Sequence, residues 1–288
     1  MFQGSMVAIV TPFKKGKIDK VTTRKLIDFH LEKGTDVIVP CGTTGESATM
    51  SQDEHEMFLS FVKEYVDGRV PVICGAGANN TEEAISLTKH AKKIKADGVL
   101  SVVPYYNKPT QEGIFKHYEA IAKAVDIPIV LYNVPGRCGV GMDPTTAIKL
   151  SKIDTVVAVK EASGCLDNVS HIVSESNLTV LSGEDPLTFP MMAIGAKGCI
   201  SVTANIVPDR VHALTEACLN GDWEKGRAIH LDLFALHKAM FIETNPIPVK
   251  TALFLMKMIN GEFRLPLCDM QSDNFHKLRT VLKEKNVL

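Results

Sequence analysis

Eight short apolar runs rich in β-branched residues recur along this chain, and they constrain its fold more than any other feature. They begin at residues 6, 36, 70, 98, 127, 155, 178 and 198. The runs are continuously apolar rather than alternating, which is typical of strands covered on both faces. Their regular spacing, with room for a helix between neighbours, predicts eight βα units. We therefore expect an α/β fold, a (β/α)8 TIM barrel.

Segments of helical period lie between these runs, and several carry start signals. Residues 51–54 (SQDE) match a capping box, and Asp precedes a first-turn Pro at 143–144 and at 185–186. The helical segment from residue 79 is expected to end at Gly98. The alternative architecture is an open doubly wound sheet, but no G-x-G-x-x-G opens the first helix.

After Val207 the strand pattern stops. Helical segments follow at 209–219, 223–240, 247–258 and 273–286, with NPIPVK (245–250) expected as a rigid turn between helices. We expect residues 1–224 to form the catalytic barrel and residues 225–288 to form a C-terminal helical region.

Charge and cysteine content narrow the class of function. The 32 basic and 33 acidic residues give a net charge of −1, so the chain as a whole is not drawn to nucleic acid or to an anionic membrane. The seven cysteines are scattered, without a C-x-x-C pair or zinc-ligand spacing. Neither a signal peptide nor a membrane-length apolar run is evident. We expect a cytoplasmic protein that acts on small molecules and binds no metal.

Lys160 follows the apolar run at 156–159 directly, at the end of a strand expected to be buried. Adjacent strand residues point to opposite faces, so Glu161 pairs poorly with it. An amine removed from water holds its proton less tightly, and a neutral amine can attack a ketone to form a Schiff base. The structural alternative is an interior lysine paired with a carboxylate from elsewhere in the chain.

The second run ends in CGTTGES, where Gly42 and Gly45 permit unusual backbone angles. The amides near Thr43 and Thr44 can then point at an anion such as a carboxylate or a phosphate. Thr43-x-x-Glu46 also matches a capping box, so Thr43 could instead only begin a helix. The stretch is not a P-loop, because no Gly-Lys-Ser/Thr follows.

The fourth and fifth runs end in PYYNKPT and YNVPGR, which puts Tyr105, Tyr106, Tyr132 and Arg137 at the rim where barrel enzymes keep their chemistry. A phenol can relay protons, and a guanidinium can grip a carboxylate through two parallel hydrogen bonds. The alternatives are ordinary packing for each tyrosine and a surface salt bridge for Arg137.

Seven stretches, in order along essentially the whole chain, carry a family resemblance: GTTGES (42–47), PYYNKPTQEG (104–113), YNVPGR (132–137), VKEASG (159–164), LSGED (181–185), ISVTAN (200–205) and NPIPVK (245–250). Together they are similar to the dihydrodipicolinate synthase family, within the pyruvate-dependent class I aldolase and N-acetylneuraminate lyase superfamily. The resemblance implies a lyase that condenses pyruvate with L-aspartate 4-semialdehyde and cyclises the adduct, the first committed step of the diaminopimelate route to lysine.

The same resemblance implies roles for individual residues. Lys160 would form a covalent imine with pyruvate, and Tyr132, Thr43 and Tyr106 would form a proton relay, with Tyr106 reaching in from a neighbouring subunit. No metal or organic cofactor is implied, because the protonated imine is the electron sink. Self-association as a homotetramer, a dimer of dimers, is also implied.

Further residues would bind the substrates. The amides of Thr43 and Thr44 would hold the carboxylate of pyruvate, and Arg137 would bind the carboxylate of the semialdehyde. Gly183 and Val202 would form the pocket wall, with Val202 standing where the family often has isoleucine.

The resemblance also implies a second site, at which many members are inhibited by lysine. Six positions match that pocket: Ser47, Ala48, His55, Asn79, Glu83 and Tyr105. Gln52 departs from the pattern, since inhibited members often have histidine there. The structural alternatives are that His55 is an exposed helix residue and that Glu83 closes a capping box with Asn80.

Two other functions remain open from the sequence. Sugar-acid aldolases on the same scaffold share the lysine and the tyrosine but tend to lack an arginine at the position of Arg137. A catalytically idle barrel kept for ligand binding is a further alternative, although it would have no reason to retain all five of these residues: Lys160, Tyr132, Thr43, Tyr106 and Arg137.

Overall fold

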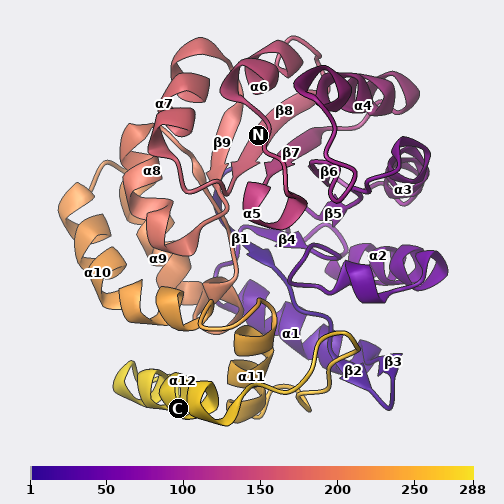
Figure 1. Ribbon diagram of the computed structural model, residues 1–288. Helices are drawn as coiled ribbons and strands as arrows, with labels where there is room; N and C mark the ends of the chain where they lie inside the picture. The colour runs from indigo at the N-terminus through magenta and orange to yellow at the C-terminus, as the bar shows by residue number, and fades with distance from the viewer. Residues whose placement is uncertain (1) are drawn as a thin grey trace.

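The computed structural model describes residues 2–288, in which eight parallel strands form a barrel surrounded by helices (Figure 1). The barrel strands are β1 Gly4–Ala8, β4 Val37–Val39, β5 Ile73–Gly75, β6 Gly98–Val102, β7 Ile129–Asn133, β8 Val156–Glu161, β9 Thr179–Ser182 and β10 Gly198–Ser201. A small antiparallel hairpin, β2 Phe13–Lys14 and β3 Lys17–Ile18, lies outside the barrel. All eight expected strands are confirmed, and the first begins two residues earlier than the apolar run that marks it.

The strands lie around the barrel in their order along the chain, and each pairs with its neighbour in parallel. The ring closes between β4 and β5 through one bridge, Ile38 to Val72, and through the Gly75 amide, which donates to the Pro40 carbonyl at 2.9 Å. Gly75 permits this approach, because a Cβ there would lie 2.1 Å from the Cys41 carbonyl oxygen.

Helices α1 to α9 follow the barrel strands along the chain, and all of them except α5 lie around the outside of the barrel: α1 Lys20–Glu32, α2 Gln52–Val66, α3 Thr81–Lys93, α4 Gln111–Ala124, α5 Pro135–Cys138, α6 Pro144–Leu150, α7 Leu166–Glu175, α8 Thr188–Ile194 and α9 Pro208–Leu219. The short α5 lies over the centre of the barrel in Figure 1, because it directly follows β7. Three 3₁₀ turns stand in the βα loops: η1 Ser47–Thr49, η2 Asp185–Leu187 and η3 Thr203–Asn205.

Three more helices complete the chain: α10 Trp223–Ala239, α11 Ile247–Leu255 and α12 Ser272–Glu284. α10 packs against α9 and α12, and α11 packs against α12, so the C-terminal helices form a layer beside the barrel (Figure 1). α10 spans residue 224, the expected boundary of the catalytic barrel, and that division of the chain stays a prediction.

Several local predictions are confirmed and others need correction. The capping box at Ser51 and Glu54 is present. The segment from 185 does not open directly as a helix: Asp185 and Pro186 lie in η2, and α8 begins at Thr188. α3 ends at Lys93, well before Gly98, because the chain turns at Lys95, where φ is 57°. The expected rigid turn at 245–250 is only partly non-helical, since α11 already begins at Ile247.

Candidate active site

Lys160 and Tyr132 face each other at the end of two neighbouring strands. Lys160 on β8 is the register partner of Tyr132 on β7, and paired residues on adjacent parallel strands share a face of the sheet. Both side chains are buried, with 5% and 7% of their surface exposed. The Lys160 ammonium nitrogen lies 4.3 Å from the centroid of the Tyr132 ring, a cation–π contact that fixes the amine beside the phenol.

The structural alternative for Lys160, a buried ion pair, is wrong for this lysine. No ion pair of Lys160 is present among residues 2–288. A buried lysine that lacks a carboxylate partner is costly for stability, which makes Lys160 a candidate for a functional role. Gly183 leaves room for it, because a Cβ at Gly183 would lie 3.0 Å from Lys160 Cε.

Two acids near Lys160 accept hydrogen bonds from the surrounding protein. Glu161 accepts from the Asn133 amide at 3.0 Å and from the Ser163 backbone at 2.7 Å, and burial raises its pKa. Asp185 accepts three hydrogen bonds through one oxygen, from the Val202 amide and from the Thr203 amide and hydroxyl. These bonds fix the end of β10, and they place buried Val202 at the barrel mouth, the position expected for a pocket wall.

The loop after β4 presents two free backbone donors. The amides of Thr43 and Thr44 have no acceptor within residues 2–288, while the amides of Gly45 and Glu46 donate back to Gly42 and Thr43. Free amides in a glycine-flanked loop form a concave donor site for an anion. The capping-box alternative for Thr43 is wrong, because no side-chain cap is made at η1 and Glu46 is engaged elsewhere.

Asn245 links the two ends of this region. Its side-chain amide donates to the Thr44 hydroxyl at 3.0 Å, and its backbone carbonyl accepts from the Arg137 guanidinium at 3.0 Å. Arg137 stands on α5 with its side chain exposed at the mouth and makes no ion pair among residues 2–288, so its remaining donors are free for an anion. The structural alternative for Arg137, a surface salt bridge, is therefore wrong.

Tyr106 does not meet Thr43 and Tyr132, the other residues expected to form the relay, within one chain. Its side chain is 88% exposed, and its backbone adopts φ 74°, which is uncommon outside glycine. A large aromatic held outward on a strained loop is unusual for a solvated surface. The geometry agrees with a side chain that completes its contacts outside its own chain.

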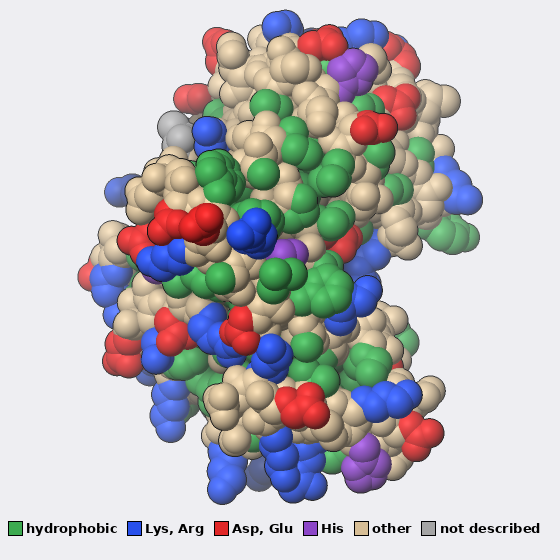
Figure 2. All heavy atoms as spheres, turned by 90° about the vertical axis from the view of Figure 1, so that its left-hand side faces the viewer, with side chains coloured by type: hydrophobic (Ala, Val, Ile, Leu, Met, Phe, Trp, Pro, Cys, Tyr) green, Lys and Arg blue, Asp and Glu red, His purple; other side chains and the backbone are tan. Residues whose placement is uncertain are grey.

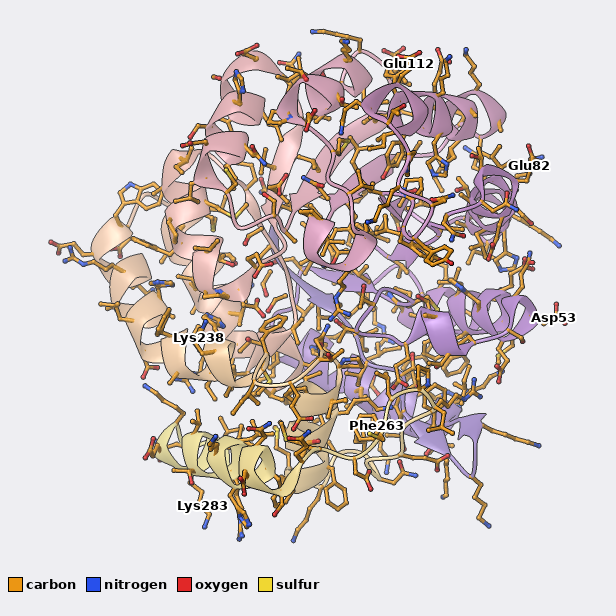
Figure 3. All side chains as sticks on the ribbon, viewed as in Figure 1. Asp53, Glu82, Glu112, Lys238, Phe263 and Lys283 are labelled. Carbon is orange, nitrogen blue, oxygen red and sulfur yellow. The ribbon has the colours of Figure 1, made fainter. Side chains whose placement is uncertain are left out.

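A buried ion pair was missed by the sequence reasoning. Lys250 on α11 and Glu46 after β4 are both fully buried and hydrogen bonded to each other. The Lys250 ammonium also donates to the Glu262 carbonyl at 2.7 Å and lies 4.7 Å from the Phe13 ring and 4.9 Å from the Phe263 ring. Phe263 is labelled in Figure 3, in the segment beyond α11. This pair connects the C-terminal helices to the loop that carries Thr43.

The six positions expected to bind lysine lie on η1, α2, α3 and the loops beside them: Ser47, Ala48, His55, Asn79, Glu83 and Tyr105. Asn79 donates to the Tyr105 carbonyl at 3.2 Å. Burial lowers the pKa of His55 and raises the pKa of Tyr105, and the negative charge of Glu83 acts on both groups in the upward direction.

Two structural alternatives for this second region do not hold. His55 is not an exposed helix residue: it is buried, and its imidazole lies 2.7 Å from the Gly75 carbonyl oxygen. Asn80 caps α3 through the Glu82 amide, and no capping box with Glu83 is present in residues 2–288. Glu83 is exposed, so its carboxylate is open to a ligand.

Residues 2–288 contain neither a metal-ligand cluster nor a bilayer-spanning helix. No group of three or more His, Cys, Asp or Glu side chains is placed to hold a metal ion. Within the same residues, no helix has the length and apolar character needed to cross a bilayer.

Comparison with known proteins gives full-length matches. The model of the dihydrodipicolinate synthetase family matches residues 1–285. A curated relative from Geotalea uraniireducens, named 4-hydroxy-tetrahydrodipicolinate synthase, is 53% identical over 290 aligned residues, covering 100% of both chains.

Solved structures agree. The dihydrodipicolinate synthase of Aquifex aeolicus superposes with a TM-score of 0.98 at 50% identity, covering 99% of each chain. The enzyme of Cyanidioschyzon merolae, solved with lysine bound, has a TM-score of 0.97 at 40% identity over 100% of this chain and 99% of its own. With fold, length and family model in agreement, this chain belongs to the dihydrodipicolinate synthetase family.

Proposed function

We propose that this chain is a 4-hydroxy-tetrahydrodipicolinate synthase that condenses pyruvate with L-aspartate 4-semialdehyde through an imine on Lys160. The observation that carries the proposal is the buried Lys160 amine, which has no carboxylate partner in residues 2–288 and lies 4.3 Å from the centre of the Tyr132 ring. The full-length relative that bears the synthase name supports the same reaction.

Pyruvate binds first, with its carboxylate on the free amides of Thr43 and Thr44. The Lys160 amine attacks the ketone, and loss of water gives the imine. The protonated imine withdraws electrons from the methyl group, which loses a proton and becomes an enamine. Tyr132 lies beside the reacting nitrogen and passes protons to and from it, with Thr43 and a neighbouring chain's copy of Tyr106 as the other members of the relay.

The enamine then adds to the aldehyde carbon of the semialdehyde, whose carboxylate is held by Arg137. Arg137 is suited to this role because its free donors form a fixed fork that matches a carboxylate. The amine of the second substrate displaces Lys160 and closes the ring. Gly183 and Val202 shape the pocket around the imine, and neither a metal nor an organic cofactor takes part.

The test is reduction by borohydride in the presence of pyruvate, followed by an assay with competing aldehydes. The proposal predicts a covalent pyruvate adduct on Lys160 and a preference for aspartate semialdehyde over sugar-derived aldehydes. A preference for the sugar aldehydes would instead make the chain a sugar-acid aldolase. Absence of the adduct would support an idle barrel.

Self-association as a homotetramer is part of the proposal. The exposed Tyr106 supports a shared site, and α10 carries further exposed apolar side chains: Trp223, Leu231 and Phe234, at 43%, 64% and 46%. The side of the molecule to which α10 belongs faces the viewer in Figure 2, where hydrophobic side chains lie among charged ones. Sedimentation velocity should give the mass of four chains, and a monomer with full activity would contradict the shared relay.

Inhibition by lysine at the second region is also proposed. The exposed Glu83 carboxylate would hold an ammonium group, and Asn79 with Tyr105 would hold the ligand carboxylate. The lysine-bound relative from Cyanidioschyzon merolae supports this assignment. If millimolar lysine leaves turnover unchanged and calorimetry detects no binding, this part of the proposal is wrong.

A reducing compartment, the cytoplasm, is the proposed location. All seven cysteines are free thiols, and five of them are buried. Such a set persists without disulfides where thiols are kept reduced.

A further inference from the structure

One acid at the barrel mouth has no structural role. Glu184 follows Gly183 at the end of β9, and its side chain is only half-buried. No hydrogen bond or ion pair of its carboxylate is present in residues 2–288, whereas Glu161 accepts hydrogen bonds through both carboxylate oxygens and Asp185 accepts three through Oδ2. Of these three acids, only Glu184 has both carboxylate oxygens without a hydrogen-bond partner in residues 2–288.

The backbone places Glu184 beside the reacting amine. β9 pairs with β8 so that Leu181 is the register partner of Lys160, and the chain then passes Lys160 at Gly183, where an added Cβ would lie 3.0 Å from Lys160 Cε. The Ser182 hydroxyl donates to the Glu184 carbonyl at 2.9 Å, which holds the backbone of this turn. Glu184 therefore stands on a rigid segment in contact with the imine-forming side chain.

Charged groups from four elements act on Glu184. Burial and then the negative charge of Asp185 on η2 raise the pKa of Glu184. Three cations act in the opposite direction: Lys160 on β8, Lys238 on α10 and Arg137 on α5. Lys238 is labelled in Figure 3 on α10, a helix that packs against η2. The Glu184 carboxylate therefore lies within the electrostatic influence of both Lys160 and Arg137.

The second substrate requires an acceptor that the assigned residues do not supply. Aspartate semialdehyde carries an α-ammonium beside its carboxylate, and Arg137 and the Thr43 and Thr44 amides are all donors. An ammonium in a partly dehydrated mouth needs a carboxylate partner. It must also lose a proton before its nitrogen can attack the imine carbon, because a protonated amine has no free electron pair.

We propose that Glu184 binds the α-ammonium of aspartate semialdehyde and accepts its proton for ring closure, a role that rests on the proposed synthase function. The proton moves from the ammonium to a Glu184 carboxylate oxygen. The freed electron pair forms a carbon–nitrogen bond at the protonated imine carbon, and the imine π electrons move to Lys160 Nζ.

Lys160 is then released in two further steps. A proton passes from the new substrate C–N⁺ centre to Lys160 Nζ. The bond between the carbon and Nζ then breaks, which releases a neutral Lys160 amine and leaves the protonated cyclic imine. The proton on Glu184 returns to solvent, so the carboxylate is ready for the next turnover.

The test compares Glu184→Gln, which removes the charge, with Glu184→Asp, which keeps it. Glu112→Gln is a matched control, since Glu112 lies on the outer face of α4 far from the barrel centre (Figure 3). Labelling of Lys160 by pyruvate and borohydride should be unchanged in all three variants. For Glu184→Gln, KM for the semialdehyde should rise about tenfold or more, as expected for losing a charged hydrogen bond. The KM of Glu184→Asp for the semialdehyde should stay close to that of the wild type.

A second probe separates recognition from general damage. The analogue of the semialdehyde in which hydrogen replaces the α-amino group offers no ammonium, so its inhibition constant should be the same for wild type and Glu184→Gln. In the wild type, acidification through the raised pKa of Glu184 should weaken binding of the semialdehyde and leave binding of the analogue unchanged. This wild-type comparison needs no variant.

The outcomes are distinguishable. If the wild type forms no Lys160 adduct with pyruvate, the proposed function fails and this assignment fails with it. If the wild type forms the adduct and uses the semialdehyde, but Glu184→Gln keeps KM for the semialdehyde within about twofold, only the role of Glu184 is overturned. If acidification weakens wild-type binding of the semialdehyde and of the analogue equally, the role of Glu184 is overturned as well.

Discussion

Gly183 lies against the side chain of Lys160, so closely that a Cβ at this position would be 3.0 Å from Lys160 Cε and 2.7 Å from Ala162 Cβ. Real Cβ atoms do not tolerate both contacts without movement of a neighbour. The glycine therefore fixes where the lysine amine stands, and a larger residue would displace it from the Tyr132 ring.

Gly183→Ala should lower kcat with pyruvate and the semialdehyde by about a hundredfold, because displacement of a reacting group by about 1 Å has effects of this size. The slower step should be imine formation, measured as the rate of borohydride-dependent labelling. Gly136→Ala is the matched control, since nothing lies within 4 Å of a Cβ there. Labelling of Gly183→Ala at the control's rate would show that Gly183 does not position Lys160.

Arg137→Ala should separate the two substrates. Loss of the guanidinium should raise KM for the semialdehyde by about a hundredfold, since two charge-assisted hydrogen bonds are removed. The rate of Lys160 labelling with pyruvate should stay near wild type. The KM of Arg137→Lys for the semialdehyde should lie between those of wild type and Arg137→Ala, because an ammonium keeps the charge but cannot form two parallel hydrogen bonds. Equal loss of labelling and of semialdehyde use would give Arg137 a broader role.

Removing one charge of the buried pair Glu46–Lys250 should destabilise the protein more than removing both charges. Lys250→Met leaves the Glu46 carboxylate buried without its partner and should lower the free energy of unfolding by about 3–5 kcal/mol. The double variant Glu46→Gln with Lys250→Met should recover much of that loss, because no unpaired charge remains. Urea unfolding checks both. The exposed pair Lys123 and Glu119 is the control, and Lys123→Met should cost less than about 0.5 kcal/mol. A double variant no more stable than Lys250→Met would contradict the account.

Patterns that depend on local spacing predicted the barrel well. Continuous apolar runs mark the eight strands because a parallel barrel buries both faces of each strand. Lys160 could be selected from the sequence because a charged side chain at the end of a buried apolar strand is energetically unfavourable unless it has a partner or a function. Start signals were less reliable: Asp185 precedes a proline as a helix cap would, yet its carboxylate binds the Val202 and Thr203 amides instead. Those amides follow the neighbouring strand β10, and no local spacing in the sequence marks the contact.

Long-range partners account for the features that the sequence did not reveal. Glu46 and Lys250 are separated by 204 positions, and Asn245 meets Thr44 across 201 positions. A single sequence contains no signal for such contacts, although an apolar helix that carries a lysine, as in NPIPVK, is a reason to look for a buried partner. Glu184 lies within the LSGED stretch, and the sequence does not show which of its neighbouring acids is hydrogen bonded.

Stability should fall on acidification because of a buried histidine. His30 is fully buried, and burial lowers its pKa from the usual 6.5 to about 3. The unfolded chain therefore binds a proton between these two values while the folded chain does not. Above pH 6.5, His30 does not make the free energy of unfolding depend on pH. Below pH 6.5, its effect lowers the free energy of unfolding by up to about 1.4 kcal/mol for each pH unit. His30→Asn should be less stable at pH 7 but should show a shallower decline between pH 6 and 4, measured by urea unfolding. An unchanged slope would contradict the pKa assignment.

The most direct test of the central claim is the site of covalent trapping by pyruvate. After borohydride reduction, peptide mass spectrometry of the wild type should find a single reduced pyruvate group, on Lys160. Lys250 is the internal control, because it is equally buried but paired with Glu46 and should remain unmodified. Lys160→Ala should show no adduct and no condensation of pyruvate with the semialdehyde. An unmodified Lys160 in the wild type, or an adduct on another lysine with full turnover, would contradict the account.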